Sequence, residues 1–231
     1  MSSVGIAPPP VVFDLDGTLI DSIHDIHFVL NTLLAEEGLS PLDLGAVKSM
    51  VGRGVRPLIR EAVAAAGVSH ADEDAWIERF VATYLRHPAD HTVVFPGVRE
   101  ILADLSEAGA PLGICTNKPR LTTAAALEAL GLKNIFRAVT CPEDVTHRKP
   151  DGRHLLDTLT AMGCPADGAV YVGDSETDVA AARNAGIPVV LVTFGYAHQS
   201  TAALGADALV SSFYELPGAL ASIRGGRKMK C

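Results

Sequence analysis

Short runs of apolar, often β-branched residues recur along the chain and alternate with longer segments of helical periodicity. Six such runs predict strands, over residues 11–13, 112–115, 138–140, 169–173, 189–193 and 208–210. Each run after the first follows a helix-like segment, and continuous apolar strands are typical of a parallel sheet that is covered on both faces. The pattern therefore predicts an α/β fold with a doubly wound, Rossmann-like parallel sheet.

The segments between these runs carry apolar residues at helical spacing. Four of them, within residues 98–105, 121–130, 155–162 and 179–185, are followed by a glycine. Glycine readily adopts the left-handed conformation that closes a helix, so each glycine supports a helix end at that point.

Residues 22 to about 95 depart from this alternation, because they show helical patterns and no convincing strand. Helices are predicted over residues 23–34, 58–66 and 76–85. Ser40-Pro41 predicts the start of a further helix, with the serine as its cap and the proline at its first position. We therefore expect a core domain of residues 1–21 and 96–231, interrupted by an all-α domain of residues 22–95.

Composition and charge exclude several classes of protein. The 231 residues are 48% hydrophobic and 20% charged, close to the average of soluble globular proteins. Acidic residues outnumber basic ones 27 to 19, whereas a protein that binds nucleic acid through its phosphates usually has a basic surplus. No run reaches the roughly 18 apolar residues of a membrane span. Neither nucleic acid nor a membrane is expected as a partner.

The cysteines and the N-terminal segment indicate a location. The four cysteines are widely spaced and form no CxxC pair, which is typical of a reducing compartment. Residues 1–10 lack the basic start and the apolar run of a signal peptide. We therefore expect a cytoplasmic protein. Its helical faces could pack internally or against a second copy, so a homodimer stays open.

Two aspartates follow the first strand, in Phe13-Asp14-Leu15-Asp16-Gly17-Thr18. Ligands of open α/β sheets bind at the carboxyl ends of the strands. Two carboxylates 4 Å apart repel by about 4 kcal/mol in a medium of effective dielectric 20, and a divalent cation would offset that repulsion. The alternative is a turn that uses aspartate and glycine only for its geometry.

A second pair of carboxylates, Asp174 and Asp178, follows the strand predicted at residues 169–173. Asp174 could share a cation with Asp14, since parallel strands end at the same edge of a sheet. Mg²⁺ prefers such oxygen ligands. Asp178 lies at the start of a helix, where capping and the helix dipole are an alternative explanation.

Two further strand ends offer groups that suit a phosphate. Thr116 and Asn117 lie between a strand and a helix, where a hydroxyl, an amide and free backbone N–H groups could cradle an anion. Lys149 precedes another helix, and its ammonium could balance Asp14 and a phosphate oxygen. For Thr116 and Asn117 the alternative is helix capping, and for Lys149 it is a solvated surface charge. The convergence of four strand ends at one edge of the sheet favours one shared site.

These residues, in this order, resemble the four motifs of the haloacid dehalogenase superfamily. Asp14 and Asp16 match the first motif, Thr116-Asn117 the second, Lys149 the third, and residues 173–178 the fourth. The helical insertion resembles the C1 cap of this superfamily. Asp21-Ser22, Thr116-Asn117-Lys118-Pro119 and residues 51–58 are similar to its phosphoglycolate phosphatase branch.

The resemblance implies a Mg²⁺-dependent phosphatase of small phosphoesters that forms an aspartyl phosphate. Asp14 would be the nucleophile, and Asp16 would protonate the leaving oxygen and then activate water. Lys149 would orient Asp14, while Thr116 and Asn117 would hold the phosphoryl group.

The same resemblance implies the metal ligands. They would be the Asp14 carboxylate, the Asp16 backbone carbonyl and Asp174, with Asp178 supporting the site from behind. The expected substrate is 2-phosphoglycolate. Arg53 lies between two glycines and could bind its carboxylate bidentately, although an exposed arginine on a turn is the alternative.

Related activities differ from this expectation in identifiable residues. Asp16 disfavours a dehalogenase, and Lys48 does not match the imine-forming lysine of the phosphonate-hydrolysing branch. A phosphatase of another small phosphoester or of pyrophosphate, and a β-phosphoglucomutase-like mutase, stay alternatives. The mutase motif typically opens with an acidic pair where this chain has Gly173-Asp174. A phosphate-binding module without turnover is disfavoured, because the nucleophile, the acid and the lysine are all present.

Overall fold

The computed structural model describes residues 8–68 and 71–228. Its main feature is a six-stranded parallel sheet in the order β5-β4-β1-β6-β7-β8. The strands are β1 (Val11–Phe13), β4 (Leu112–Cys115), β5 (Ala138–Thr140), β6 (Val170–Gly173), β7 (Val189–Val192) and β8 (Ala208–Val210). In the central strand β1, Phe13 lies opposite Ile114 of β4 and Val172 of β6. The predicted α/β fold is confirmed, with every predicted strand in the sheet.

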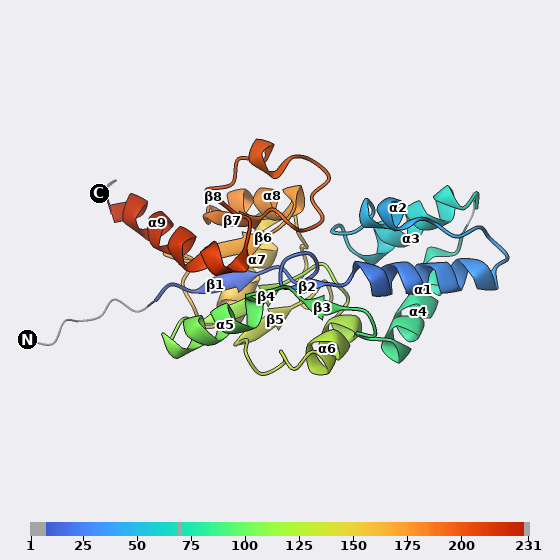
Figure 1. The fold of residues 1–231 in the computed structure, drawn as a ribbon, viewed down its shortest axis with the longest axis horizontal. Helices are drawn as coiled ribbons and strands as arrows, with labels where there is room; N and C mark the ends of the chain where they lie inside the picture. The colour runs from blue at the N-terminus through green and yellow to red at the C-terminus, as the bar shows by residue number, and fades with distance from the viewer. Residues whose placement is uncertain (1–7, 69–70, 229–231) are drawn as a thin grey trace, which may run out of the picture.

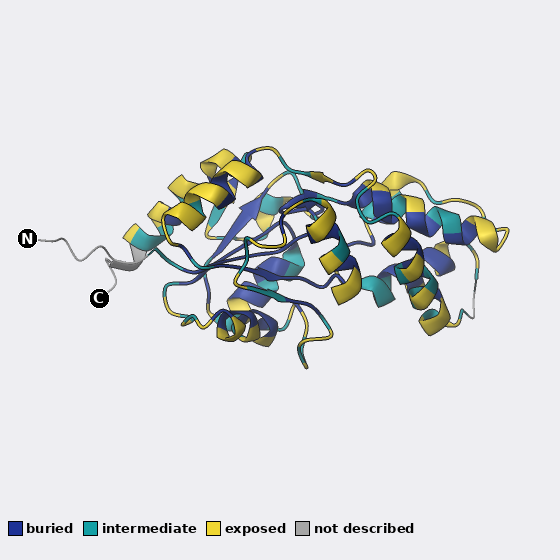
Figure 2. Cartoon of the chain, turned by 90° about the horizontal axis from the view of Figure 1, so that it is seen from below, coloured by how far each residue is buried: buried dark blue, intermediate teal, exposed yellow. Residues whose placement is uncertain are grey.

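Helices cover both faces of this sheet (Figure 1). One face packs against α5 (Val98–Glu107), α6 (Arg120–Ala129) and α9 (Leu216–Lys228), and the other against α7 (Gly152–Ala161) and α8 (Glu176–Ala185). Side chains of β1 alternate between the two faces, so Val11 and Phe13 join the first cluster and Val12 the second. Figure 2 shows the strands as dark, buried ribbons between helices with exposed outer faces.

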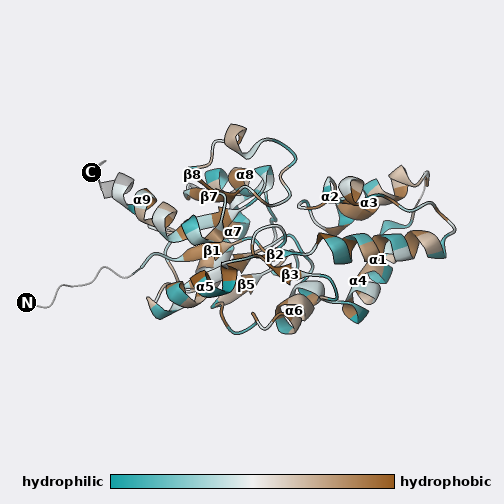
Figure 3. Ribbon diagram, in the orientation of Figure 1, coloured by the Kyte–Doolittle hydropathy of each residue, from teal (hydrophilic) through white to brown (hydrophobic). Residues whose placement is uncertain are grey.

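Four helices form a separate hydrophobic core at one end of the molecule (Figure 1). They are α1 (Ile23–Glu36), α2 (Leu44–Lys48), α3 (Val55–Ala65) and α4 (Glu73–Arg86). Figure 3 shows that these helices alternate between hydrophobic and hydrophilic stretches, as amphipathic helices around a small core do. Within the described ranges, none of the helices combines the length and the apolar character that a membrane span requires.

Two details of this region differ from the prediction. The chain enters and leaves the helices through β2 (Ile20–Asp21) and β3 (Val93–Val94), which pair antiparallel, so the expectation of no strand here is wrong. Strands of two residues are too short to show an alternating pattern. The helix expected at Ser40-Pro41 begins instead at Leu44, because the Asp43 carboxylate caps it by accepting from the Ala46 N–H at 2.8 Å.

Tyr196, in the loop after β7, connects the sheet to the start of α1. Its hydroxyl accepts hydrogen bonds from the backbone N–H groups of Ser22 (2.8 Å) and Ile23 (3.1 Å) and donates to Asp21 Oδ1 (2.7 Å). The Ser22 side chain does not cap α1, since its hydroxyl donates to Asp16 Oδ1 instead. The Tyr196 hydroxyl therefore replaces a helix cap.

Replacing Tyr196 by phenylalanine is expected to lower the free energy of unfolding by about 1–3 kcal/mol, because two buried N–H groups lose their acceptor. Denaturant unfolding followed by circular dichroism measures this loss. Tyr214→Phe is the matched control, since Tyr214 is exposed and its hydroxyl donates to the exposed Glu100 at 3.3 Å. Equal stability of the two variants would contradict the capping role.

Candidate active site

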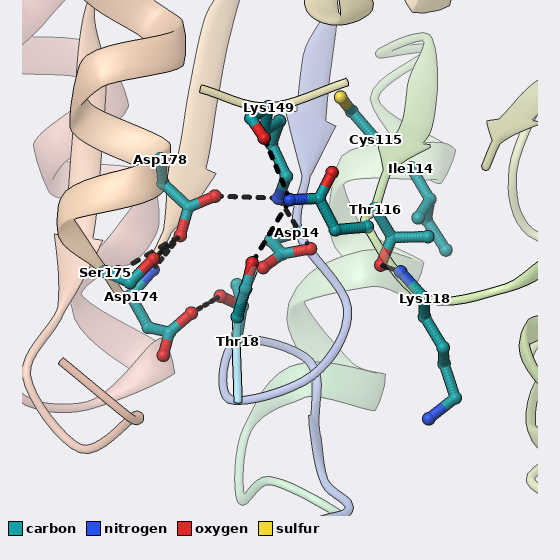
Figure 4. Close-up of polar contacts among 12 residues, drawn as sticks. Asp14, Thr18, Ile114, Cys115, Thr116, Lys118, Lys149, Asp174, Ser175 and Asp178 are labelled. Atoms are coloured by element: carbon teal, nitrogen blue, oxygen red, sulfur yellow. Dashed lines mark hydrogen bonds and ion pairs between the residues drawn. The ribbon is translucent and has the colours of Figure 1, made fainter. Parts of the chain in front are cut away.

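Three carboxylates meet at the carboxyl ends of β1 and β6 (Figure 4). Asp14 follows β1 directly, Asp174 follows β6, and Asp178 lies in the first turn of α8. Each offers an oxygen within 4.8 Å of the others, and all three residues are buried. The neighbouring positions of β1 and β6 in the sheet thus bring Asp14 together with the second predicted pair, whereas Asp16 lies outside this cluster and contacts Lys118.

Glycines allow this close approach. A Cβ on Gly195 would overlap with the Asp174 side chain and would lie 2.6 Å from the carbonyl oxygen of Gly17. A Cβ on Gly173 would overlap with Asp178. Both positions therefore require the absence of a side chain, which is a packing requirement at the site itself.

Gly195→Ala is expected to displace Asp174, and hence to reduce turnover at least about tenfold and stability by about 1–3 kcal/mol. Steady-state kinetics and thermal melting measure the two effects. Gly218→Ala serves as the control, because a Cβ on Gly218 of α9 would meet nothing within 4 Å. If Gly195→Ala behaved like the control, Asp174 would not depend on this contact.

Lys149 lies inside the carboxylate cluster. Its Nζ is 2.9 Å from Asp14 Oδ1 and 2.8 Å from Asp178 Oδ1, and it donates to the hydroxyl of Tyr171 at 2.8 Å. Only 1% of its side chain is exposed. Lys149 is thus not a solvated surface charge, and it lies where it can orient Asp14.

The cluster carries more negative charge than Lys149 can balance. Burial raises the pKa of Asp14 to about 7; the charge of Lys149 opposes this shift and that of Asp178 adds to it. Burial, together with the charges of Asp178 and Asp14, also raises the pKa of Asp174 well above its usual range. A divalent cation would supply the positive charge that keeps both groups ionised. The cluster therefore fits such a cation.

Asp178 differs from the other two carboxylates because its oxygens already have donors. Oδ1 accepts from Lys149 and from the Tyr171 hydroxyl, and Oδ2 accepts from the Ser175 hydroxyl at 2.7 Å and from the N–H groups of Asp174 and Ser175. Burial acts to raise the pKa of Asp178, but Lys149 and these hydrogen bonds outweigh it and the pKa is lowered. Asp178 both caps α8 and holds Lys149, which suits a supporting residue rather than a metal ligand.

A pocket of about 500 Å³, partly open to solvent, lies between this strand edge and α1, α3 and α4 of the helical insertion. Its polar wall contains Asp14, Asp16, Thr116, Asn117 and Lys118. The side facing it is mostly apolar and includes Ile26, Val51, Val55, Leu58 and Phe80 of the helical insertion. Predicted residues from two strand ends thus line one cavity.

Thr116 and Asn117 both face this pocket and are buried. The Thr116 hydroxyl accepts from the N–H of Lys118 at 3.1 Å. The Asn117 amide donates to the carbonyl oxygens of Gly52 (3.2 Å) and Lys149 (3.1 Å), while its own Oδ1 has no partner among the described residues. Asn117 therefore connects the strand edge with the helical insertion.

Lys118 is a further residue of this site, and its role here was not predicted from the sequence. Its Nζ lies 3.0 Å from Asp16 Oδ1 and 4.5 Å from the ring centroid of Tyr84 in α4. Its signals in the sequence are its position directly after Thr116-Asn117 at a strand end and its place in the segment 116–119 that resembles the phosphoglycolate phosphatase branch.

Arg53 is not brought into the pocket. Its side chain is 47% exposed and pairs with Glu61 at 2.9 Å, and it is absent from the residues that line the cavity. Its role in binding a carboxylate stays a prediction.

Comparison with known proteins gives the class. The family of haloacid dehalogenase-like hydrolases matches residues 11–192, and the chain belongs to this family. It is 44% identical over 211 residues to the phosphoglycolate phosphatase of Caulobacter vibrioides, covering 90% of this chain and 89% of that protein. It is 43% identical over 215 residues to the phosphoglycolate phosphatase of Rhodospirillum rubrum, with the same two shares covered.

Solved structures agree with this assignment. The crystal structure of a predicted phosphoglycolate phosphatase from Haemophilus somnus is similar with a TM-score of 0.87 and 25% identity, covering 93% of this chain and 98% of that one. CbbY from Rhodobacter sphaeroides, solved with phosphate, shares the fold with a TM-score of 0.79 at 21% identity. The predicted membership of the superfamily is confirmed.

Proposed function

We propose that this protein hydrolyses 2-phosphoglycolate to glycolate and phosphate. The observation that carries the proposal is the buried Asp14, paired with Lys149 at the wall of a pocket that also contains Asp16. The relatives at 43–44% identity, which are phosphoglycolate phosphatases, support the substrate.

The chemistry follows from the arrangement of the side chains. An Asp14 oxygen attacks phosphorus and forms an acyl phosphate, while the bond from phosphorus to the glycolate oxygen breaks. Asp16 gives its proton to that oxygen, then takes a proton from the water that releases phosphate. Lys149 holds the Asp14 carboxylate. The Thr116 hydroxyl and the backbone N–H of Asn117 hold the phosphoryl oxygens, since the side-chain amide of Asn117 already donates to Gly52 and Lys149.

We propose Mg²⁺ as the cation of the carboxylate cluster. Asp14, Asp174 and the backbone carbonyl of Asp16 would hold it, and Asp178 would support them through its contacts with Lys149 and the Asp174 N–H. When bound, Mg²⁺ neutralises charge on the phosphoryl oxygens. The turn after β1 is tight, because the Leu15 carbonyl accepts from the N–H groups of Leu19 and Ile20. The carboxylate and carbonyl oxygens around it are the ligands that Mg²⁺ prefers.

We further propose that residues 22–95 act as a cap domain on a core of residues 1–21 and 96–231. The separate hydrophobic core of the four helices and their two crossing strands support this division. Closure of the cap would exclude water while Asp14 attacks.

We also propose a cytoplasmic location, and the free thiols of Cys115, Cys141 and Cys164 support it.

Phosphate release from 2-phosphoglycolate, sugar phosphates and pyrophosphate, each with and without Mg²⁺, tests the function. We expect Mg²⁺-dependent release that is fastest with 2-phosphoglycolate. A preference for another phosphoester would keep the chemistry and discard the substrate. Conversion of a sugar 1-phosphate to its 6-phosphate, without release, would identify a mutase instead.

A further inference from the structure

The charges along the pocket wall are unevenly distributed. Among the described residues that line the cavity, Asp14 and Asp16 are acidic and Lys118 is the one with a positive side chain. Lys149 lies behind Asp14 and is occupied by two carboxylates. A substrate with a second anionic group besides its phosphate therefore meets one cation at the pocket wall, Lys118, which pairs with Asp16 and not with the carboxylate cluster.

Lys118 and Lys149 are directed to different parts of the site. Lys149 points into the carboxylate cluster, whereas the Lys118 side chain points away from it (Figure 4). The Lys118 Nζ lies instead against Asp16 of the core and the ring of Tyr84 in α4. Lys118 is thus on the side of Asp16, where the leaving group of the ester would lie, and not on the side of the metal ligands.

The chemistry of a phosphorylated 2-hydroxy acid matches this position. In 2-phosphoglycolate the carboxylate is attached to the same carbon as the ester oxygen, so it lies two bonds from the atom that Asp16 would protonate. A cation within hydrogen-bond distance of Asp16 can therefore also reach the carboxylate. The 3.0 Å contact between Lys118 Nζ and Asp16 Oδ1 meets this requirement.

Lys118 is also held in place. Its side chain is 5% exposed, and its backbone N–H donates to the Thr116 hydroxyl. The Arg53 guanidinium is exposed and pairs with Glu61 outside the cavity, whereas Lys118 lines the pocket. The Lys118 ammonium has three N–H donors, so it can bind a substrate carboxylate while it contacts Asp16.

We propose that Lys118 is the specificity-determining residue of the pocket and that it binds the carboxylate of the substrate. The site then selects small acids phosphorylated on the 2-hydroxyl group over neutral phosphoesters of the same length. This inference rests on the proposed function, because it takes the ester oxygen to lie at Asp16.

Kinetics with two substrates test the proposal: 2-phosphoglycolate and ethyl phosphate, which has the same phosphoester and carbon chain without the carboxylate. In Lys118→Met, which keeps the length of the apolar stem, we expect the ratio of kcat/KM for the two substrates to fall about 10- to 100-fold. Most of this fall would be a higher KM for 2-phosphoglycolate. Lys118→Arg should retain part of the preference, and Lys133→Met, at an exposed lysine, should retain all of it.

The outcomes separate the inference from the proposed function. If the wild-type protein does not prefer 2-phosphoglycolate, the proposed substrate is overturned, and the role of Lys118 with it. If the wild type prefers it and Lys118→Met keeps the ratio, only the role of Lys118 is overturned. Equal losses on both substrates would assign Lys118 to the phosphoryl group or to the fold, and would also overturn it. Lys118→Gln replaces the methionine variant if thermal melting shows that the latter does not fold.

Discussion

Asp14→Asn should reduce kcat by at least about 10³-fold and leave the protein at least as stable as the wild type. The amide cannot attack phosphorus, so the first half-reaction stops. The fold should not suffer, because burial raises the pKa of Asp14 to about 7 and its ionised form is unfavourable before a cation binds. A neutral group of the same shape removes one of three neighbouring carboxylates.

Phosphate release and thermal melting without added metal measure the two halves of this prediction. Mass spectrometry after rapid acid quenching should find phosphate on Asp14 in the wild type and none in Asp14→Asn. Asp43→Asn is the matched control. Asp43 is the N-terminal capping residue of helix α2, and asparagine caps a helix as well as aspartate does. Turnover within tenfold of the wild type would remove Asp14 as the nucleophile.

The fold could be predicted because its signals are local. The four inner strands, β4, β1, β6 and β7, are continuous runs buried on both faces, and most of the helices end near a glycine. The meeting of Asp14 and Asp174 then follows from the parallel sheet, because both residues come directly after neighbouring strands, β1 and β6, that end at the same edge.

What the sequence did not predict depends on contacts between distant segments. Lys118 pairs with Asp16 across 102 positions of the chain, and Tyr196 meets the start of α1 across 174. Neither contact leaves a periodic pattern. Arg53 shows the converse: its glycine neighbours suggested a binding loop, but a nearby carboxylate, Glu61, is available to pair with it on the surface.

Lys149→Met should abolish turnover and also destabilise the protein, in contrast to Asp14→Asn. Lys149 is the one cation that contacts both Asp14 and Asp178 among the described residues, and removing one partner of a buried ion pair costs about 3–5 kcal/mol. The loss should be larger at high pH, where the remaining carboxylates are ionised. Denaturant unfolding of Lys149→Met beside Lys133→Met measures it.

The double variant Asp14→Asn with Lys149→Met shows which contact of Lys149 accounts for the loss of stability in Lys149→Met. If the uncompensated charge of Asp14 is a main cause, adding Asp14→Asn should recover part of the lost free energy of unfolding, with a coupling of about 0.5–3 kcal/mol. Strict additivity would instead locate the cost at Asp178 and the Tyr171 hydroxyl, the other two contacts of the Lys149 ammonium. The double variant stays inactive in either case, because it lacks the carboxylate that attacks phosphorus. In the wild type the two residues depend on each other: Lys149 positions Asp14, and the carboxylates of Asp14 and Asp178 allow the Lys149 ammonium to be buried.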